Sequence, residues 1–333
     1  MSDYQKLTPT EYKPILDFIV TVARKAGALI LEGSAAIQTV SSQETGVNEK
    51  KNSVDLVTEY DVRVEELLLK ELKNGYPNFK FIGEESYSAG KREPLTDDPT
   101  FCVDPIDGTT NFVHGIPFVC VSIGVIYERR PIIGVIYNPF LDHLYTAAKS
   151  HGAYLTRNNG TPQRLPLASP PKPLSSLHGA VIGVEWGSER SSESMAGKSS
   201  SFVKLAGDPE RGVPGGKMAH SLRSFGSGAL NCAMVAQGAL DMYWEIGCWP
   251  WDVSAGIIIV QEAGGIITGS HKVLSDTINA EQFGDVTEDI LFGRKYLLIR
   301  GIADTPTESG RDAQKRLLKE FYDTVVDVEP QYD

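Results

Sequence analysis

Apolar residues recur at helical spacing in several stretches of the chain. The first stretch, residues 11–32, places them every three to four positions and ends near Gly33, which predicts an amphipathic helix. A second helix is expected over residues 62–72, with Thr58 or Asp61 as its cap. Three later helices are predicted: an apolar one within residues 223–238, another that opens at Asp252 and ends at Gly264 and Gly265, and an amphipathic one over about residues 311–326.

Runs of apolar and β-branched residues predict a sheet between residues 117 and 148. V-C-V-S-I-G-V-I-Y and I-I-G-V-I-Y flank the turn E-R-R-P, and H-L-Y-T-A-A follows a second turn, which favours an antiparallel meander. Because these runs are almost unbroken, both faces of the sheet should be covered. Further strands are expected at residues 79–83, 100–103, 180–187 and 295–301. Residues 188–220 are rich in Ser, Gly, Lys and Pro, so we expect a long surface excursion there.

Composition narrows the class of protein. A chain of 333 residues with 41% hydrophobic residues can bury a large core. The net charge is 32 minus 43, or -11, and no basic block is present, so nucleic acid is not an expected partner. The chain start lacks a signal-like pattern and no apolar run is long enough for a bilayer, which predicts a cytoplasmic protein without a membrane partner. The four cysteines form no C-x-x-C pair and are expected to be reduced and mostly structural.

The stretch from Val103 to His114, V-D-P-I-D-G-T-T-N-F-V-H, carries the clearest candidate chemistry. Asp104 and Asp107 lie three residues apart around the rigid ring of Pro105. Gly108 allows a backbone conformation that leaves amides near Thr109 facing an anion. Carboxylates supply metal ligands and amides supply a phosphate seat. For a lone D-x-x-D-G, an Asp-rich turn capping a helix is the commoner explanation, but this stretch is longer and is not the only one of its kind in the chain.

Four further carboxylates accompany this stretch. Glu84 and Glu85 stand at the end of a short predicted strand, so we expect only one of them to face a site. Asp55 lies among apolar residues, where its carboxylate is either paired or functional, or else bonds local amides in a turn. Asp252 opens a helix and could be a simple cap.

Several hydrolase mechanisms are excluded by the sequence. It contains no C-x5-R, D-x-D-x-T, G-x-S-x-G or H-E-x-x-H motif, and the histidines form no ligand-spaced pair. What remains is a set of oxygen ligands, which select magnesium, manganese or calcium over zinc: Glu84, Asp104, Asp107 and Asp252. Two such ions would activate a water and stabilise the leaving oxygen of a phosphate ester.

Three motifs in order carry a resemblance: G-E-E-S at 83–86, D-P-I-D-G-T-T-N-F-V-H at 104–114 and W-D-V-S-A-G at 251–256. With V-D-L-V-T-E-Y-D, they resemble the inositol monophosphatase family of magnesium-dependent, lithium-sensitive phosphatases, and its fungal-type members in particular. The resemblance implies hydrolysis of myo-inositol monophosphate. Relatives with the same signatures cleave fructose 1,6-bisphosphate, phosphoadenosine phosphate, histidinol phosphate or galactose 1-phosphate, so these alternatives stay open.

The resemblance also implies an architecture. The fold is α/β, a layered α-β-α-β-α sandwich with mixed and antiparallel sheets, of the type shared with fructose 1,6-bisphosphatase. We expect one compact unit over residues 1–333, with a metal-binding half at 1–178 and an α/β half at 179–333. The family is usually homodimeric, and its substrate is a small phosphorylated polyol.

Roles for single residues follow from the resemblance. Two or three magnesium ions per site would be bound by Glu84, Asp104, the Ile106 carbonyl, Asp107 and Asp252, with Asp104 bridging two of them. Thr109, oriented by Asp55, would position and deprotonate the attacking water, while the amides of Gly108 and Thr109 hold the phosphate. Glu245 would contact the sugar hydroxyls, with Gly226, Ser227, Gly228 and Asp241 nearby.

Departures from the family's pattern lie mostly around the expected substrate, at Trp249, Pro250 and Gly228. They bear on the choice of polyol and leave the metal ligands intact. A non-catalytic sensor of sugar phosphates or cations is a further alternative. Such a protein should lack a metal ligand or Thr109, and none is missing here.

Overall fold

The computed structural model describes residues 6–39, 47–50 and 56–330. The chain divides into two compact units. Unit 1 comprises Met1–Arg164, Gly226–Ala233 and Pro250–Glu262, and unit 2 comprises Leu165–Phe225, Met234–Trp249 and Ala263–Asp333. Two short segments from late in the sequence therefore complete the unit that the N-terminal part of the chain builds.

Unit 1 is built on a sheet that has seven strands among the described residues, in the order β3-β4-β5-β6-β7-β8-β9. The strands are β3 Lys80–Gly83, β4 Thr100–Asp107, β5 Cys120–Tyr127, β6 Arg130–Asn138, β7 His143–Ala148, β8 Gly152–Arg157 and β9 Gln163–Arg164. β3 and β4 pair in parallel, and every later pair is antiparallel. The predicted meander is confirmed. Strands β1 Val47–Glu49 and β2 Leu56–Thr58 form a separate antiparallel pair.

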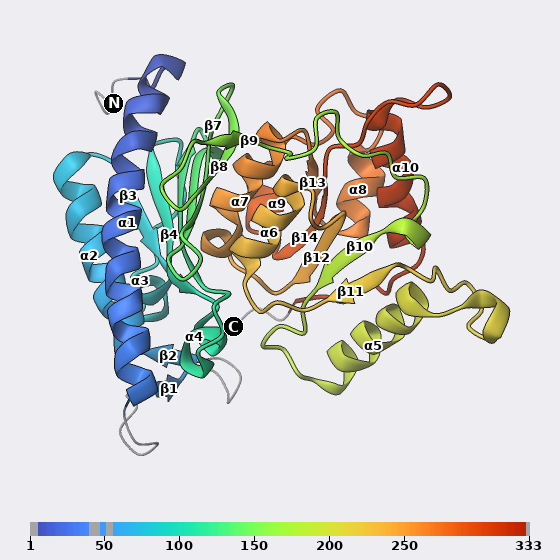
Figure 1. Ribbon diagram of the computed structural model, residues 1–333, viewed down its shortest axis with the longest axis horizontal. Coiled ribbons are helices and arrows are strands. Elements are labelled where there is room, and N and C mark those ends of the chain that lie inside the picture. Colours follow the sequence, from blue (N-terminus) through green and yellow to red (C-terminus); the bar gives the residue numbers. More distant parts are fainter. Residues whose placement is uncertain (1–5, 40–46, 51–55, 331–333) are drawn as a thin grey trace. The chain divides into compact units, whose positions relative to one another are not determined.

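Helices cover both faces of this sheet, as its apolar runs predict (Figure 1). Helix α1, Pro9–Thr39, packs its buried side chains against Val121, Ile123 and Val135 on one face, with α2, Glu59–Gly75, beside it. Helix α7, Pro250–Glu262, packs on the other face. There Gly124 and Gly134 let α7 approach closely: a Cβ at either would lie 2.3 Å from an atom of the helix.

The predicted end of the first helix near Gly33 is wrong, because α1 continues to Thr39. Gly33 is a packing residue there: a Cβ added to it would lie 2.5 Å from the Tyr60 ring of α2. Helix α2 begins at Glu59, three residues before its predicted start, and Thr58 caps it as expected. The Thr58 hydroxyl accepts from the Tyr60 N–H, and the Asp61 carboxylate accepts from the Thr58 N–H in return.

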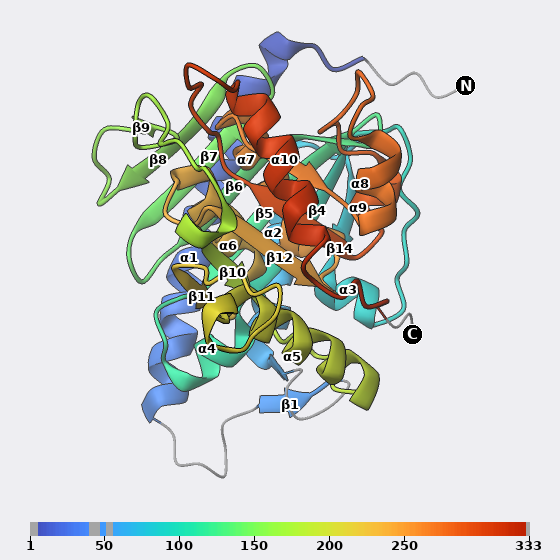
Figure 2. The ribbon, with the colours of Figure 1, turned by 90° about the vertical axis from the view of Figure 1, so that its right-hand side faces the viewer.

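Unit 2 is built on a mixed sheet of five strands within the described part of the chain, in the order β11-β10-β12-β14-β13. The strands are β10 Val181–Val184, β11 Ser221–Arg223, β12 Met242–Ile246, β13 Ile266–Thr268 and β14 Lys295–Ile299. β10 pairs in parallel with β11 and β12, whereas β14 is antiparallel to both its neighbours. Helix α10, Gly310–Tyr322, lies across the sheet and buries Leu317, Leu318 and Phe321 in its core (Figure 2).

The predicted surface excursion over residues 188–220 is wrong in one respect, since it contains helix α5, Ser192–Ala206. Ser191 caps this helix, and its buried face consists largely of small or polar residues, which hide the helical period. The remaining helices are α3 Glu84–Ser88, α4 Thr109–His114, α6 Gly228–Gln237, α8 His271–Thr277 and α9 Glu288–Leu291, with 3-10 turns η1 Leu177–Gly179 and η2 Pro209–Arg211.

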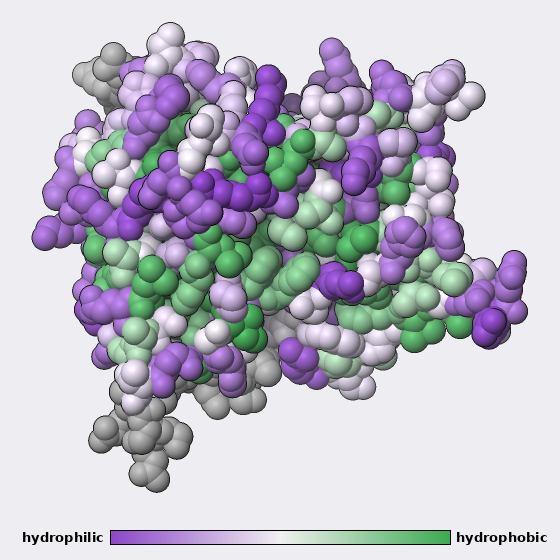
Figure 3. All heavy atoms as spheres, viewed as in Figure 1, coloured by the Kyte–Doolittle hydropathy of each residue, from purple (hydrophilic) through white to green (hydrophobic). Residues whose placement is uncertain are grey.

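The α/β fold class with mixed and antiparallel sheets is confirmed. On the face drawn in Figure 3, polar and apolar residues are interspersed. No helix among the described residues is long and apolar enough to cross a membrane. The described cysteines form no disulfide, and three of them are buried.

Candidate active site

Strand β4 delivers the two central aspartates of unit 1. Asp104 pairs with Ser122 of β5, and the ladder then shifts register before Asp107 pairs with Cys120. The Asp104 carboxylate accepts from the Ile106 N–H at 2.9 Å, so the bulge is closed by its own side chain. Gly108 follows at φ +93, and a Cβ there would lie 3.0 Å from the Phe118 carbonyl oxygen. A glycine is therefore required where the strand turns into α4.

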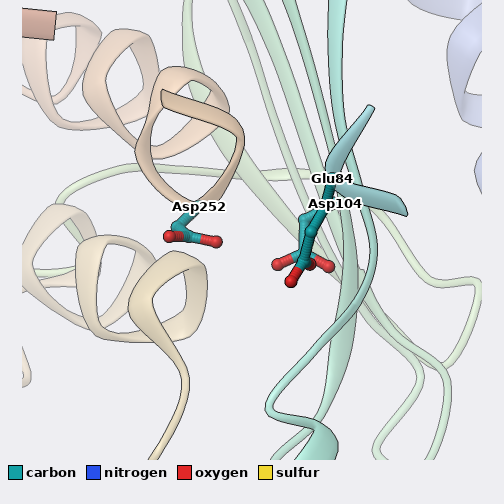
Figure 4. Close-up of side chains that lie close together, drawn as sticks. All are labelled: Glu84, Asp104 and Asp252. Atoms are coloured by element: carbon teal, nitrogen blue, oxygen red, sulfur yellow. The ribbon is translucent and has the colours of Figure 1, made fainter. Parts of the chain in front are cut away.

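Three carboxylates converge beside this bulge (Figure 4). Glu84 opens α3, Asp104 lies on β4, and Asp252 lies in the first turn of α7. One oxygen from each lies within 4.8 Å of the other two. Burial, and then the charges of neighbouring carboxylates, raise the pKa of Asp104 well above its usual value.

This cluster fits a hard divalent cation, because it offers several anionic oxygens at short range and no sulfur or imidazole ligand. It joins segments separated by about 170 residues in the sequence, which all belong to unit 1. Glu84 differs from its expected setting at a strand end, since it begins a helix. The cluster thus unites three of the four carboxylates singled out in the sequence.

Asp107 faces the start of α6 instead. Its carboxylate accepts from the Ser227 hydroxyl, from the Ala229 N–H at 2.8 Å and from the Gly228 N–H at 3.2 Å. Burial raises the pKa of Asp107 to about 6, and these three hydrogen bonds oppose the rise. The predicted substrate-binding residues Ser227 and Gly228 therefore lie in direct contact with Asp107, and Gly226 precedes them at φ +76.

Thr109 lies in the first turn of α4 and contacts a second aspartate. Its hydroxyl lies 3.2 Å from an Asp61 oxygen and 3.1 Å from the Ile106 carbonyl oxygen. Asp61 is 1% exposed, and burial raises its pKa to about 6, against the opposing hydrogen bonds from Thr58. Asp55, predicted to orient Thr109, lies outside the described residues.

Lys50 provides a cation at the edge of the cluster. Its Nζ lies 2.8 Å from a Glu84 oxygen and 2.7 Å from a Glu85 oxygen. Burial lowers the pKa of Lys50, but the two carboxylates outweigh it and the net pKa is raised. Burial and the Glu84 charge raise the pKa of Glu85 to about 8. Both glutamates thus share one partner, contrary to the expectation that they point apart.

Asp241 and Glu245 belong to unit 2. Asp241 accepts from the Val181 N–H at 2.8 Å and from Arg300 Nε at 2.7 Å, so it ties β10 to the residue after β14. Glu245 accepts from the Tyr243 hydroxyl and from the Ile246 N–H, each at 2.8 Å. Burial raises the pKa of Glu245 to about 7, although the nearby charge of Lys198 opposes this.

Three residues near the site were not predicted: Asp61 as a partner of Thr109, Glu65 as the acceptor of the Glu85 and Ser86 N–H groups, and Lys50 as the partner of Glu84 and Glu85. A signal for the two acids was present: Asp61 and Glu65 lie four residues apart on the face of α2 that also buries Val64 and Leu68. Charged residues within an apolar helical stripe are rarely buried without a partner. Lys50 carried no comparable signal, because it lies in a polar stretch.

Comparison with known proteins gives consistent matches. The model of the inositol monophosphatase family matches residues 11–324. Protein qutG of Emericella nidulans is 41% identical over 321 residues, covering 94% of this chain and 93% of its own. Inositol monophosphatase 2 of Saccharomyces cerevisiae is 42% identical over 227 residues, covering 67% and 73%. Among solved structures, the extragenic suppressor protein suhB from Bartonella henselae superposes with a TM-score of 0.68 at 28% identity, covering 92% of this chain and 98% of its own.

Proposed function

The chain belongs to the inositol monophosphatase family and is a phosphoric monoester hydrolase, and we propose that it hydrolyses myo-inositol monophosphate to myo-inositol and phosphate. The observation that carries the reaction is the cluster of Glu84, Asp104 and Asp252. It lies in the same unit as the contact between Thr109 and Asp61. One unit thus combines a place for cations with a hydroxyl held by a buried carboxylate.

We propose Mg²⁺ as the cofactor, with two or three ions per site. Glu84, Asp104 and Asp252 would hold them, together with the Ile106 carbonyl and Asp107. A carboxylate has about four acceptor sites, so Asp107 can bind an ion while it accepts hydrogen bonds from the start of α6. When bound, such ions supply Lewis-acid chemistry that lowers the pKa of water and neutralises charge on a phosphate ester.

Thr109 and Asp61 would handle the proton of the attacking water. The Thr109 hydroxyl lies 3.2 Å from Asp61, whose other oxygen accepts from the Thr58 N–H at 2.8 Å. The Thr109 hydroxyl has one hydrogen and can donate it to Asp61 or to the Ile106 carbonyl, which lies 3.1 Å away. When it donates to Asp61, its oxygen can accept a proton from water while Asp61 accepts the threonine proton. We assign to Asp61 the orienting role that the family resemblance suggested for Asp55.

The substrate contacts are proposed from the family. The backbone N–H groups of Gly108 and Thr109 would bind the phosphate, where the positive φ of Gly108 turns the chain. Gly226, Ser227 and Gly228 would line the site, and Glu245 would accept a proton from a hydroxyl of the polyol. Asp241 would lie nearby: each of its oxygens accepts one hydrogen bond within unit 2 and keeps a further acceptor site for the polyol.

A second candidate is a phosphatase of another small phosphate ester: galactose 1-phosphate, fructose 1,6-bisphosphate, histidinol phosphate or phosphoadenosine phosphate. Protein qutG, one of the relatives that match almost the whole chain, bears a name that states no substrate. The segment around Trp249 and Pro250, which departs from the family's pattern, also lies between Glu245 and Asp252.

Phosphate release from these esters, measured with and without Mg²⁺, tests the proposal. We expect the highest kcat/KM for myo-inositol 1-phosphate and no turnover in EDTA. A tenfold or greater preference for one of the other esters would reassign the substrate. Turnover that is undiminished in EDTA would refute the role of the carboxylate cluster.

A cytoplasmic location and a homodimer stay predictions from the sequence. Light scattering coupled to size-exclusion chromatography tests the second. A mass near twice 36.3 kDa is expected for the dimer, and a single-chain mass would contradict it.

A further inference from the structure

Glu65 of α2 is a buried carboxylate that reaches a different helix. Its Oε2 accepts from the Glu85 N–H at 2.7 Å, and its Oε1 accepts from the Ser86 N–H at 2.8 Å and from the Ser86 hydroxyl. These N–H groups lie in the first turn of α3, where a helix has no acceptors of its own. Glu65 is 4% exposed, so the carboxylate is satisfied by these donors and shielded from water.

The segment that Glu65 holds begins with a cluster carboxylate. Glu84 is the first residue of α3, directly before the Glu85 N–H that Glu65 accepts. On its other side the backbone is held by the pairing of Gly83 with Val103, next to Asp104. The backbone of Glu84 is thus held from both sides, by a strand pair and by Glu65.

Gly83 is adapted to this arrangement. A Cβ at this position would lie 2.5 Å from Glu65 Oε2 and 2.6 Å from its carboxyl carbon. Because Gly83 has no side chain, the Glu65 carboxylate can lie against the backbone where β3 leads into α3. One helical turn earlier on α2, Asp61 lies 3.2 Å from the Thr109 hydroxyl, so a single face of α2 contacts both parts of the site.

We infer that Glu65 is a positioning residue: it sets the location of Glu84 and thereby the Mg²⁺ affinity of the cluster, without touching ion or substrate. The inference rests on the proposed function, since it takes the cluster as the ion site. A glutamine at position 65 can accept through one oxygen only, and its NH2 group would face an N–H donor. The first turn of α3 must then shift, and Glu84 with it.

The test is calorimetric titration with Mg²⁺ of four purified full-length variants. Glu65→Gln should weaken Mg²⁺ binding about 10–100-fold, as loss of an outer partner of a metal ligand does. Glu65→Asp keeps the charge but withdraws the carboxylate by one methylene, and should weaken binding similarly. Ser86→Ala removes one donor and should cost about 2–10-fold. Glu66→Gln, on the exposed neighbour, is the matched control and should change nothing.

Two further measurements separate positioning from mere stability. Urea unfolding in EDTA reports the fold alone. The kcat at saturating Mg²⁺ should stay near the unmodified value, because Glu65 accepts from Glu85 and Ser86 and is proposed to touch neither ion nor substrate. If the Glu65 variants unfold at lower urea concentration but bind Mg²⁺ with unchanged affinity, the inference is overturned. Normal affinity in Glu65→Asp alongside a loss in Glu65→Gln would also overturn it, since charge alone would then explain the effect.

Ser86→Ala keeps the inference testable if neither Glu65 variant folds, because it leaves the carboxylate in place. Unchanged Mg²⁺ affinity in Ser86→Ala would then count against positioning. Failure of the proposed function gives a different result: the unmodified protein itself would bind no Mg²⁺ in the same titration.

Discussion

Asp104→Asn should stabilise the metal-free protein and abolish its response to Mg²⁺. Asp104 is 2% exposed, and its carboxylate lies within 4.8 Å of the oxygens of Glu84 and Asp252. Two unit charges 4.8 Å apart repel by about 3.5 kcal/mol at an effective dielectric constant of about 20. Asparagine removes the charge at Asp104 but can still accept from the Ile106 N–H, so the bulge of β4 should persist.

The net gain should be smaller than the sum of two such repulsions. The raised pKa of Asp104 lets the unmodified protein take up a proton, and the ammonium of Lys50 already offsets charge at Glu84. We therefore expect the variant to gain about 1–3 kcal/mol in free energy of unfolding when metal is absent. With Mg²⁺ at 100 times its Kd, the unmodified protein should gain about 2.7 kcal/mol through ion binding. With Mg²⁺ present, the unmodified protein should therefore be as stable as the variant or more stable.

Urea unfolding followed by tryptophan fluorescence, in EDTA and in saturating Mg²⁺, measures both effects. Turnover should fall by several orders of magnitude in the variant while its fold stays intact. Glu93→Gln, at an exposed carboxylate, is the control and should leave both curves unchanged. A variant that is less stable than the unmodified protein in EDTA, or that Mg²⁺ stabilises to the same extent, would refute the reasoning.

Three further predictions concern catalysis, one concerns the pH dependence of stability and one concerns packing. Thr109→Ala should lower kcat by 10²-fold or more, because the hydroxyl that contacts Asp61 is lost. The Mg²⁺ affinity should stay unchanged. Kinetics measure the first quantity and calorimetry the second. Glu245→Gln should slow hydrolysis of myo-inositol 1-phosphate more than that of glycerol 2-phosphate, and equal losses would assign Glu245 to the fold. Burial in the folded protein raises the pKa of Glu245 from 4.5 to about 7. The protonated carboxyl therefore contributes fully to the free energy of unfolding below pH 4.5, and this contribution is lost as the pH rises through 7. Glu245→Gln should remove this pH dependence, which urea unfolding at several pH values measures. Lithium should inhibit uncompetitively with respect to substrate, as the family resemblance implies, and unaltered turnover in millimolar lithium would place the chain among resistant members. Gly33→Ala should destabilise α1 against Tyr60 by about 1–3 kcal/mol, and a thermal unfolding midpoint at or above the unmodified value would contradict this.

The sequence by itself determined the parts of this protein that local chemistry encodes. The meander from β5 to β7 followed from apolar runs broken by turns, since a strand's pattern and its turn residues are read within a few positions. Asp104 was found from the D-P-I-D-G stretch that follows an apolar run, and Asp252 from its place at the start of a predicted helix together with the motif W-D-V-S-A-G. The expectation of an oxygen-binding cation, which stays a prediction, followed from the ligand types alone.

Only the tertiary structure decided what each carboxylate does. Asp61 completes the capping box of α2, whose cap is Thr58, but its second oxygen lies 3.2 Å from the hydroxyl of Thr109, 48 residues away. Asp107 stands three residues from Asp104, yet its carboxylate accepts from the start of α6, more than 100 residues later. The physical reason is that a carboxylate accepts from whatever donors reach it, and the packing of α2, α3 and α6 against β4 determines which donors those are.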